Sequence, residues 1–151
     1  LMFKKYNDTP ATIAMCIWLL GALFYIFQTL FMTETFLSDR GIDVSAIPIE
    51  RFFALTWVGF VIGFILTLVY GPDGQKVFFI TVLTTQLAWA IYGGYLYFWG
   101  GSGPSFDVTP QTHDHTLEMS LAHGGHLTHG ALDAVIIAAL LFTVFRLKSR
   151  L

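Results

Sequence analysis

Residues 52–99 read FFALTWVGFVIGFILTLVYGPDGQKVFFITVLTTQLAWAIYGGYLYFW, two long apolar runs joined by a short polar turn. Neither the first run (52–70) nor the second (77–99) contains a charged residue. Runs of about 20 apolar residues are long enough to cross the hydrocarbon core of a bilayer as helices. The turn GPDGQK (71–76) is so short that the two helices are expected to be antiparallel neighbours. The stretch therefore predicts a transmembrane helical hairpin.

Two more apolar runs flank this hairpin, and the whole composition agrees with them. Only 12% of the 151 residues are charged, whereas soluble domains carry about 25%. We therefore expect an all-α integral membrane protein, a four-transmembrane-helix bundle that forms a single domain over residues 1–151. The expected spans are about 11–32, 52–70, 77–99 and 130–147, and the expected outer loops are 33–51 and 100–129.

Local signals suggest where two of these helices begin. Asp8 or Thr9 is a candidate N-cap for the first span, with Pro10 at the first helical position. Pro48 is expected to stop any helix before the second span. Within that span, Gly59 and Gly63 are four residues apart, a spacing that allows close helix contact, and we expect a packing face within the bundle there.

The distribution of lysine and arginine predicts the orientation in the membrane. Six of the eight lie on the side of the two termini, and none lies between residues 77 and 145. Loops that carry Lys and Arg stay in the cytoplasm. Both termini are therefore expected to be cytoplasmic, in a multi-pass protein of the bacterial inner membrane with loop 100–129 on the periplasmic side. The six are Lys4, Lys5, Lys76, Arg146, Lys148 and Arg150.

All five histidines fall within residues 113–129, HDHTLEMSLAHGGHLTH. If this segment were helical up to Asp133, then His126, His129 and Asp133 would share one face, because their spacing is i, i+3, i+7. Imidazole and carboxylate together are ligands of zinc, copper or iron. The candidate metal ligands are His126, His129, Asp133, His123, His113 and His115.

Two other interpretations of this segment stay open. The histidines can simply face solvent in a polar loop or pair with nearby carboxylates, or they can exchange protons between pH 5 and 8. Gly124 and Gly125 argue against a single helix, because adjacent glycines are poor helix formers. The composition thus indicates a metal site more clearly than the spacing does.

Asp133 has two interpretations of its own. As a carboxylate in the first turn of the fourth span, it would be stabilised by the positive end of the helix dipole. Alternatively, it could pair with Arg51 at the same depth, since charged groups inside membranes are often functional.

The interior of the predicted bundle offers little for chemistry. At mid-depth we find only Gln86 and threonines, so Gln86 is expected to make an ordinary hydrogen bond between helices, and Gln28, nearer the outer surface, likewise. Spans without histidine exclude a bis-histidine haem in the bilayer, and the chain has no glycine-rich phosphate loop, catalytic triad or cysteine motif. The aromatic residues at the end of 77–99, from Trp89 onward, are typical of a membrane-interface belt; a ligand-facing aromatic wall is the alternative.

Two hypotheses for function follow. The first is a non-catalytic accessory subunit that packs in the bilayer against other membrane protein subunits or against itself. Small residues support it, both in the second span and in the fourth, where Ala131, Ala134 and Ala138 line one side. The second is a metal-binding protein or metal-dependent enzyme that uses residues 113–133. No basic patch exists, which excludes a nucleic-acid partner.

Overall fold

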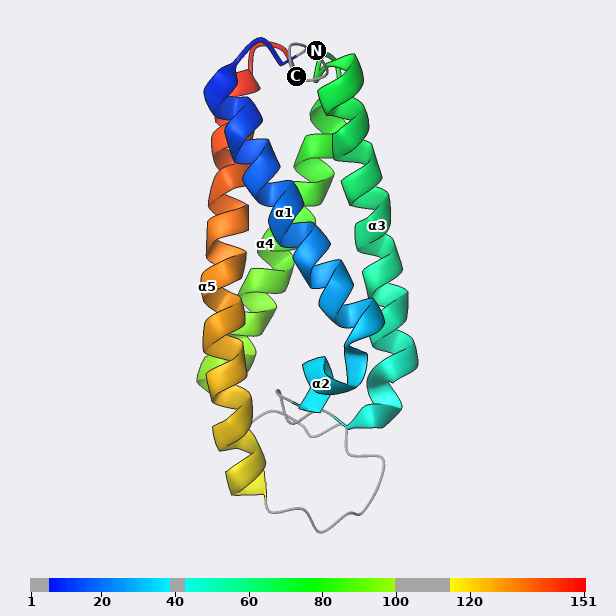
Figure 1. Ribbon diagram of the computed structural model, residues 1–151. Helices are drawn as coiled ribbons and strands as arrows, with labels where there is room; N and C mark the ends of the chain where they lie inside the picture. Colours follow the sequence, from blue (N-terminus) through cyan, green and yellow to red (C-terminus); the bar gives the residue numbers. More distant parts are fainter. Residues whose placement is uncertain (1–5, 39–42, 100–114) are drawn as a thin grey trace.

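The computed structural model describes the backbone of residues 6–38, 43–99 and 115–151, and their side chains except those of 92–99 and 115–130. These parts are helical, without a strand among them (Figure 1). Four long helices, α1, α3, α4 and α5, are accompanied by the short α2 and the 3-10 turn η2. Their bounds are α1 Thr9–Phe31, α2 Thr33–Ser38, η2 Val44–Ala46, α3 Ile47–Tyr70, α4 Lys76–Trp99 and α5 His115–Leu147.

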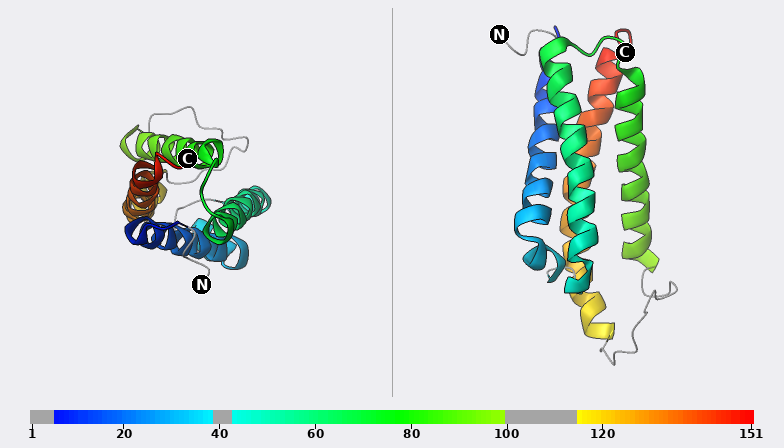
Figure 2. Two further views of the ribbon diagram at one scale, coloured as in Figure 1. Left: turned by 90° about the horizontal axis from the view of Figure 1, so that it is seen from above. Right: turned by 90° about the vertical axis from the view of Figure 1, so that its right-hand side faces the viewer.

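The four long helices form an antiparallel bundle with both termini at one end (Figures 1 and 2). Helix α1 packs along both α5 and α3, and α4 packs along α5. In contrast, α3 and α4 make far less backbone contact with each other, although the turn between them is short. The predicted hairpin is therefore antiparallel as expected, but large side chains hold its two helices apart.

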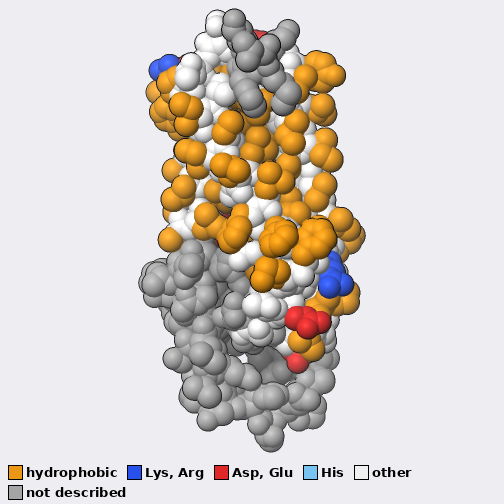
Figure 3. All heavy atoms as spheres, viewed as in Figure 1, with side chains coloured by type: hydrophobic (Ala, Val, Ile, Leu, Met, Phe, Trp, Pro, Cys, Tyr) orange, Lys and Arg blue, Asp and Glu red, His pale blue; other side chains and the backbone are white. Residues whose placement is uncertain are grey.

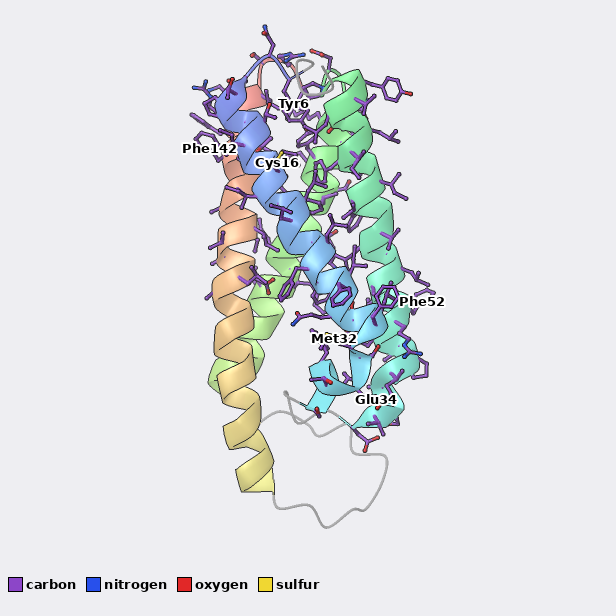
Figure 4. All side chains as sticks on the ribbon, viewed as in Figure 1. Tyr6, Cys16, Met32, Glu34, Phe52 and Phe142 are labelled. Atoms are coloured by element: carbon purple, nitrogen blue, oxygen red, sulfur yellow. The ribbon has the colours of Figure 1, made fainter. Side chains whose placement is uncertain are left out.

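Two helices of the described part, within Thr9–Phe31 and Val44–Tyr70, are long and apolar enough to cross a membrane. In α4, the residues with described side chains, Lys76–Ile91, form a shorter apolar helix. Large hydrophobic side chains cover the sides of the bundle, and the visible charged groups lie toward its ends (Figure 3). Phe52 and Phe142, for example, point outward (Figure 4) and are 69% and 45% exposed.

The start of α1 agrees with expectation, and the start of α3 does not. At α1, the Asp8 carboxylate accepts a hydrogen bond from the Ala11 amide at 2.9 Å, which confirms the predicted cap. At α3, Pro48 lies in the first turn instead of ending a helix, because a first-turn amide has no partner within the helix to lose.

The last helix is much longer than the expected span 130–147. Helix α5 begins at His115 and continues through Gly124 and Gly125 without a break. The expected loop 100–129 is therefore helical from residue 115 onward, and Asp133 lies deep inside a helix. The interpretation of Asp133 as a first-turn carboxylate is wrong for this reason.

Aromatic side chains fill the half of the bundle nearer the termini. Phe64 is fully buried and contacts Trp18, Phe78 and Phe79, with ring centroids 4.5, 4.8 and 5.0 Å away. The Phe78 ring also covers Gly63, where an added Cβ would come within 2.3 Å of it. Gly63 thus belongs to an internal packing face as predicted, but Gly59 has open space beside it.

Polar contacts close the same end of the bundle. Arg146 forms an ion pair with Asp8 at 2.7 Å, and Arg150 forms one with Asp73 at 2.6 Å. Arg150 also donates to the carbonyl of Tyr6, whose phenol lies 2.7 Å from the Thr67 hydroxyl. These contacts connect the start of α1, the α3–α4 turn and the end of α5.

Candidate functional site

A cavity lies midway along the bundle and is lined by residues of all four long helices. Its volume is about 60 Å³, which is room for a few water molecules. Most of the lining is apolar or aromatic, and two polar residues stand out against it. The lining includes Ala22, Tyr25, Trp57, Gln86, Trp89 and Asp133.

Gln86 is the more deeply buried of the two polar residues. Its side chain is 3% exposed, and its Oε1 accepts a hydrogen bond from Trp18 Nε1 at 2.9 Å. An indole can only donate, so this bond determines which end of the amide faces Trp18. The predicted interhelical hydrogen bond of Gln86 is confirmed.

The other end of the same amide is unusual. Gln86 Nε2 is buried and has no hydrogen-bond partner among the described residues. A buried N–H group that loses its hydrogen bond to water costs about 1–3 kcal/mol. Native structures leave few buried donors of this kind unsatisfied.

Asp133 brings a carboxylate from α5 to the same cavity, where it is partly buried. It already takes part in an interaction of its own. The alternative in which it pairs with Arg51 fails within the described residues, because Arg51 Nε instead donates to Thr33 Oγ1 at 3.1 Å.

Aromatic rings form the remaining walls. Trp57 contacts Trp18 at 6.2 Å and Tyr25 at 5.6 Å between ring centroids. The Tyr25 hydroxyl is turned toward the bundle end, where it donates to Glu50 at 2.9 Å. Trp89 lines the cavity and is 42% exposed.

Most of the sequence-predicted site residues fall where the structure does not describe the side chains. His115, His123, His126 and His129 are in the helical part of α5 whose side chains are not described, and residue 113 lies outside the described backbone. Among the described side chains, no group of three His, Cys, Asp or Glu residues could hold a metal ion. Only Asp133 of the six candidates is placed, and it lines the cavity.

The expectation that the interior offers little for chemistry was incomplete. The sequence places Gln86 at mid-depth, but an expected span of 130–147 places Asp133 near the membrane surface. One signal could have placed it correctly. Residues 133, 136, 140, 143 and 147 recur at alternating steps of three and four, the pattern of one inward helix face.

Gln28 differs from Gln86 in its outcome. Its Oε1 is buried without a hydrogen-bond partner among the described residues.

The threonines at mid-depth in α4 form hydrogen bonds within their own helix. Thr84 and Thr85 donate their hydroxyl hydrogens to carbonyls of their own helix, at 2.9 and 2.8 Å, so they present little polarity outward.

Comparisons with protein-family models, with curated proteins and with solved structures found no match to this chain.

Proposed function

We propose that the chain is a multi-pass membrane protein and a non-catalytic subunit of a larger membrane complex. In this proposal α1, α3, α4 and α5 cross the bilayer, and both termini lie in the cytoplasm. The belt of exposed apolar side chains supports a lipid environment. The internal hydrogen bonds of the α4 threonines support it further, because polar groups that face lipid must be satisfied within the protein. The basic residues at the end with the termini support the orientation.

A strip of small residues on the outside of α5 carries the subunit proposal. Ala131, Ala134 and Ala138 are all exposed, so the smooth side of this helix is turned away from the bundle's own interior. In membranes, small residues let the helices of different chains approach closely, and packing there drives association. Gly59 adds a second open position on α3.

Native electrophoresis in a mild detergent tests association. We expect the wild-type protein to migrate well above monomer size and Ala134→Leu to shift it toward the monomer, because leucine keeps the partner helix at a distance. Ala88→Leu is the matched control, since Ala88 is exposed on α4. Migration of the wild-type protein at monomer size would contradict the proposal.

Cysteine labelling tests the orientation separately. In a Cys16→Ser background, which has no other cysteine, Ser45→Cys should react with a membrane-impermeant maleimide in intact cells. Ser149→Cys should react only after the cells are lysed. The reverse pattern would contradict cytoplasmic termini without affecting the subunit proposal.

A metal-binding function is the second candidate, and one observation favours it. Because α5 is uninterrupted from His115 to Leu147, positions 126, 129 and 133 share one helix face. They extend the alternating three- and four-residue steps of the buried residues Ile136 and Leu140. This register supports a His-His-Asp set on one face of α5, the kind of ligand set that zinc, copper or iron takes.

Metal analysis of purified protein tests this candidate. We expect about one equivalent of zinc, copper or iron in the wild-type protein and a loss of most of it in His126→Ala and His129→Ala. Less than a tenth of an equivalent in the wild-type protein would exclude the site. Equal loading of all three proteins would show adventitious metal instead.

A further inference from the structure

We propose that a cleft between α3 and α4 binds one anionic phospholipid of the cytoplasmic leaflet, with an acyl chain in the cleft and the phosphate at Lys76. The cleft lies near the α3–α4 turn, at the end of the bundle with the termini (Figure 1). The proposal rests on the membrane location and orientation proposed above, and it is separate from the subunit and metal functions.

The cleft is a recess in the side of the bundle. Its volume is about 280 Å³, and it forms between two helices that make little backbone contact with each other. Leu66 and Tyr70 line it and are 48% and 76% exposed, so the cleft is open to the surroundings of the bundle. Its described lining consists of Gly63, Leu66, Thr67, Tyr70, Gln75 and Phe78.

The lining becomes more polar toward the turn. Gly63, Leu66 and Phe78 line the part farther from the turn, and Tyr70 and Gln75 line the part next to it. Tyrosine is enriched where a membrane meets water, because its ring is apolar and its hydroxyl is polar. A phospholipid has the same order along its length, from hydrocarbon chain to polar headgroup.

Thr67 does not interrupt the apolar part of the cleft. Its side chain is 5% exposed, and its hydroxyl donates to the Phe64 carbonyl at 2.8 Å and lies 2.7 Å from the Tyr6 hydroxyl. The α3 residues of the lining fall within 63–70, which is about two helical turns. A recess of this length suits a flexible acyl chain better than a rigid partner helix about 10 Å wide.

Charge complementarity favours an anionic headgroup. The described part of this end holds two carboxylates, Asp8 and Asp73, and each pairs with an arginine. Asp73, which precedes the cleft residues of α4, bonds the Arg150 guanidinium through both of its oxygens, at 3.0 and 2.6 Å. Arginine thus neutralises both of these acidic groups, and the positive charge left over at this end comes from lysine.

Lys76 is the described lysine beside the cleft. It directly follows the lining residue Gln75 and is exposed at the start of α4. Lys148 is exposed as well, but it follows α5, where its ammonium lies 4.7 Å from the ring centroid of Phe145. Residues 1–5 contain two more lysines and no acidic residue. Basic pockets between transmembrane helices on the cytoplasmic side bind anionic lipid headgroups, and Lys76 supplies the basic group here.

Two lipids with identical chains test the headgroup. Dioleoylphosphatidylglycerol is anionic and dioleoylphosphatidylcholine is zwitterionic. Native mass spectrometry of the protein released from micelles that contain equal amounts of both measures which lipid is bound first. We expect the wild-type protein to prefer phosphatidylglycerol about fivefold, the contribution of one lysine close to an anionic lipid.

Two pairs of variants test the location. Lys76→Gln should reduce the preference for phosphatidylglycerol to about onefold, whereas Lys148→Gln, the same change at the other exposed lysine, should leave it near fivefold. Leu66→Trp fills the cleft and should weaken the binding of phosphatidylglycerol at least fivefold in a titration. Leu55→Trp is its matched control, because Leu55 is exposed on α3 outside the cleft.

Equal occupancy by the two lipids in the wild-type protein would overturn the proposal. An equal loss of preference in Lys76→Gln and Lys148→Gln would overturn it too, because a diffuse attraction to the basic end would then select the lipid. Unchanged binding in Leu66→Trp would show that no chain enters the cleft. These measurements use detergent-solubilised protein, so their failure leaves the results of native electrophoresis and cysteine labelling intact. Reversed labelling would instead assign the cleft to the outer leaflet without changing the preference measured in micelles.

Discussion

The two halves of the bundle differ in what fills their interior. Between the termini and Trp18, aromatic rings pack around Phe64, and two ion pairs connect Arg146 with Asp8 and Arg150 with Asp73. Beyond Trp18, the interior opens into a cavity with a carboxylate and an unpartnered amide hydrogen-bond donor. Folded proteins tolerate such incompletely satisfied groups mainly where function requires them. We infer that the packing around Phe64 contributes more to the stability of the bundle than the packing around the cavity does.

The largest expected effect comes from removing a ring from the packed half. Phe64→Ala should lower the free energy of unfolding by about 3 kcal/mol, because it deletes contacts with Trp18, Phe78 and Phe79 and leaves a void. Ile137→Ala is the matched change at the cavity wall. It should cost about 1 kcal/mol, since its side chain already borders empty space.

Unfolding of both variants in mixed micelles, monitored by tryptophan fluorescence, gives the comparison. Equal losses for Phe64→Ala and Ile137→Ala would show that the two halves are packed alike. In that case the contrast between tight packing around Phe64 and looser packing around the cavity would be wrong.

A second contrast uses the two glycines of α3. Gly63→Ala should destabilise the protein by about 1–3 kcal/mol, because the new Cβ would come within 2.3 Å of Phe78. Gly59→Ala meets nothing within 4 Å and should be neutral or stabilising by up to about 1 kcal/mol, through its better helix propensity. Thermal midpoints of both variants in detergent check the sign of each effect, and a destabilising Gly59→Ala would reveal a partner chain packed there.

Much of the helical architecture could be predicted from apolar runs and caps. The α1 cap at Asp8 and the packing role of Gly63 follow from local chemistry, which one sequence contains in full. The start of α5 could not be predicted, because Gly124 and Gly125 are poor helix formers. The structure nevertheless continues the helix through them.

The cavity could not be predicted for a different reason. It depends on Trp18 and Gln86, 68 residues apart in the chain, and on the spacing of α3 and α4, which a short turn alone does not determine. Trp89 was expected to belong to a belt at the membrane interface, yet it lines the cavity. The alternative, an aromatic wall that faces the interior, agrees better with the position of Trp89. Which way this side chain faces depends on how the helices pack.

Tyr6 allows a smaller test at the packed end. Burial raises the pKa of its phenol to about 12. The unfolded chain loses this proton near pH 10, so the contribution of Tyr6 to stability is complete below pH 10 and is lost as the pH rises toward 12. Tyr6→Phe should remove this loss of stability between pH 10 and 12. It should also remove the part of the phenolate absorbance at 295 nm that appears only near pH 12. A phenol that titrates near pH 10 in the folded protein would show that this end is open to water.

The smallest effect concerns the two ion pairs at the same end. The Ala11 amide and then Arg146 lower the pKa of Asp8, and Arg150 lowers that of Asp73. Their stabilisation is therefore complete above about pH 4, the usual pKa of an aspartate, and it is lost as the pH falls through the lower values of the folded state. Asp8→Asn should reduce the acid sensitivity more than Asp73→Asn, because Asp8 also caps α1. Unfolding measured between pH 2 and 7 checks this order, and equal acid curves for wild-type and both variants would assign the acid response to carboxylates elsewhere, with Asp133 in the cavity as the next group to replace.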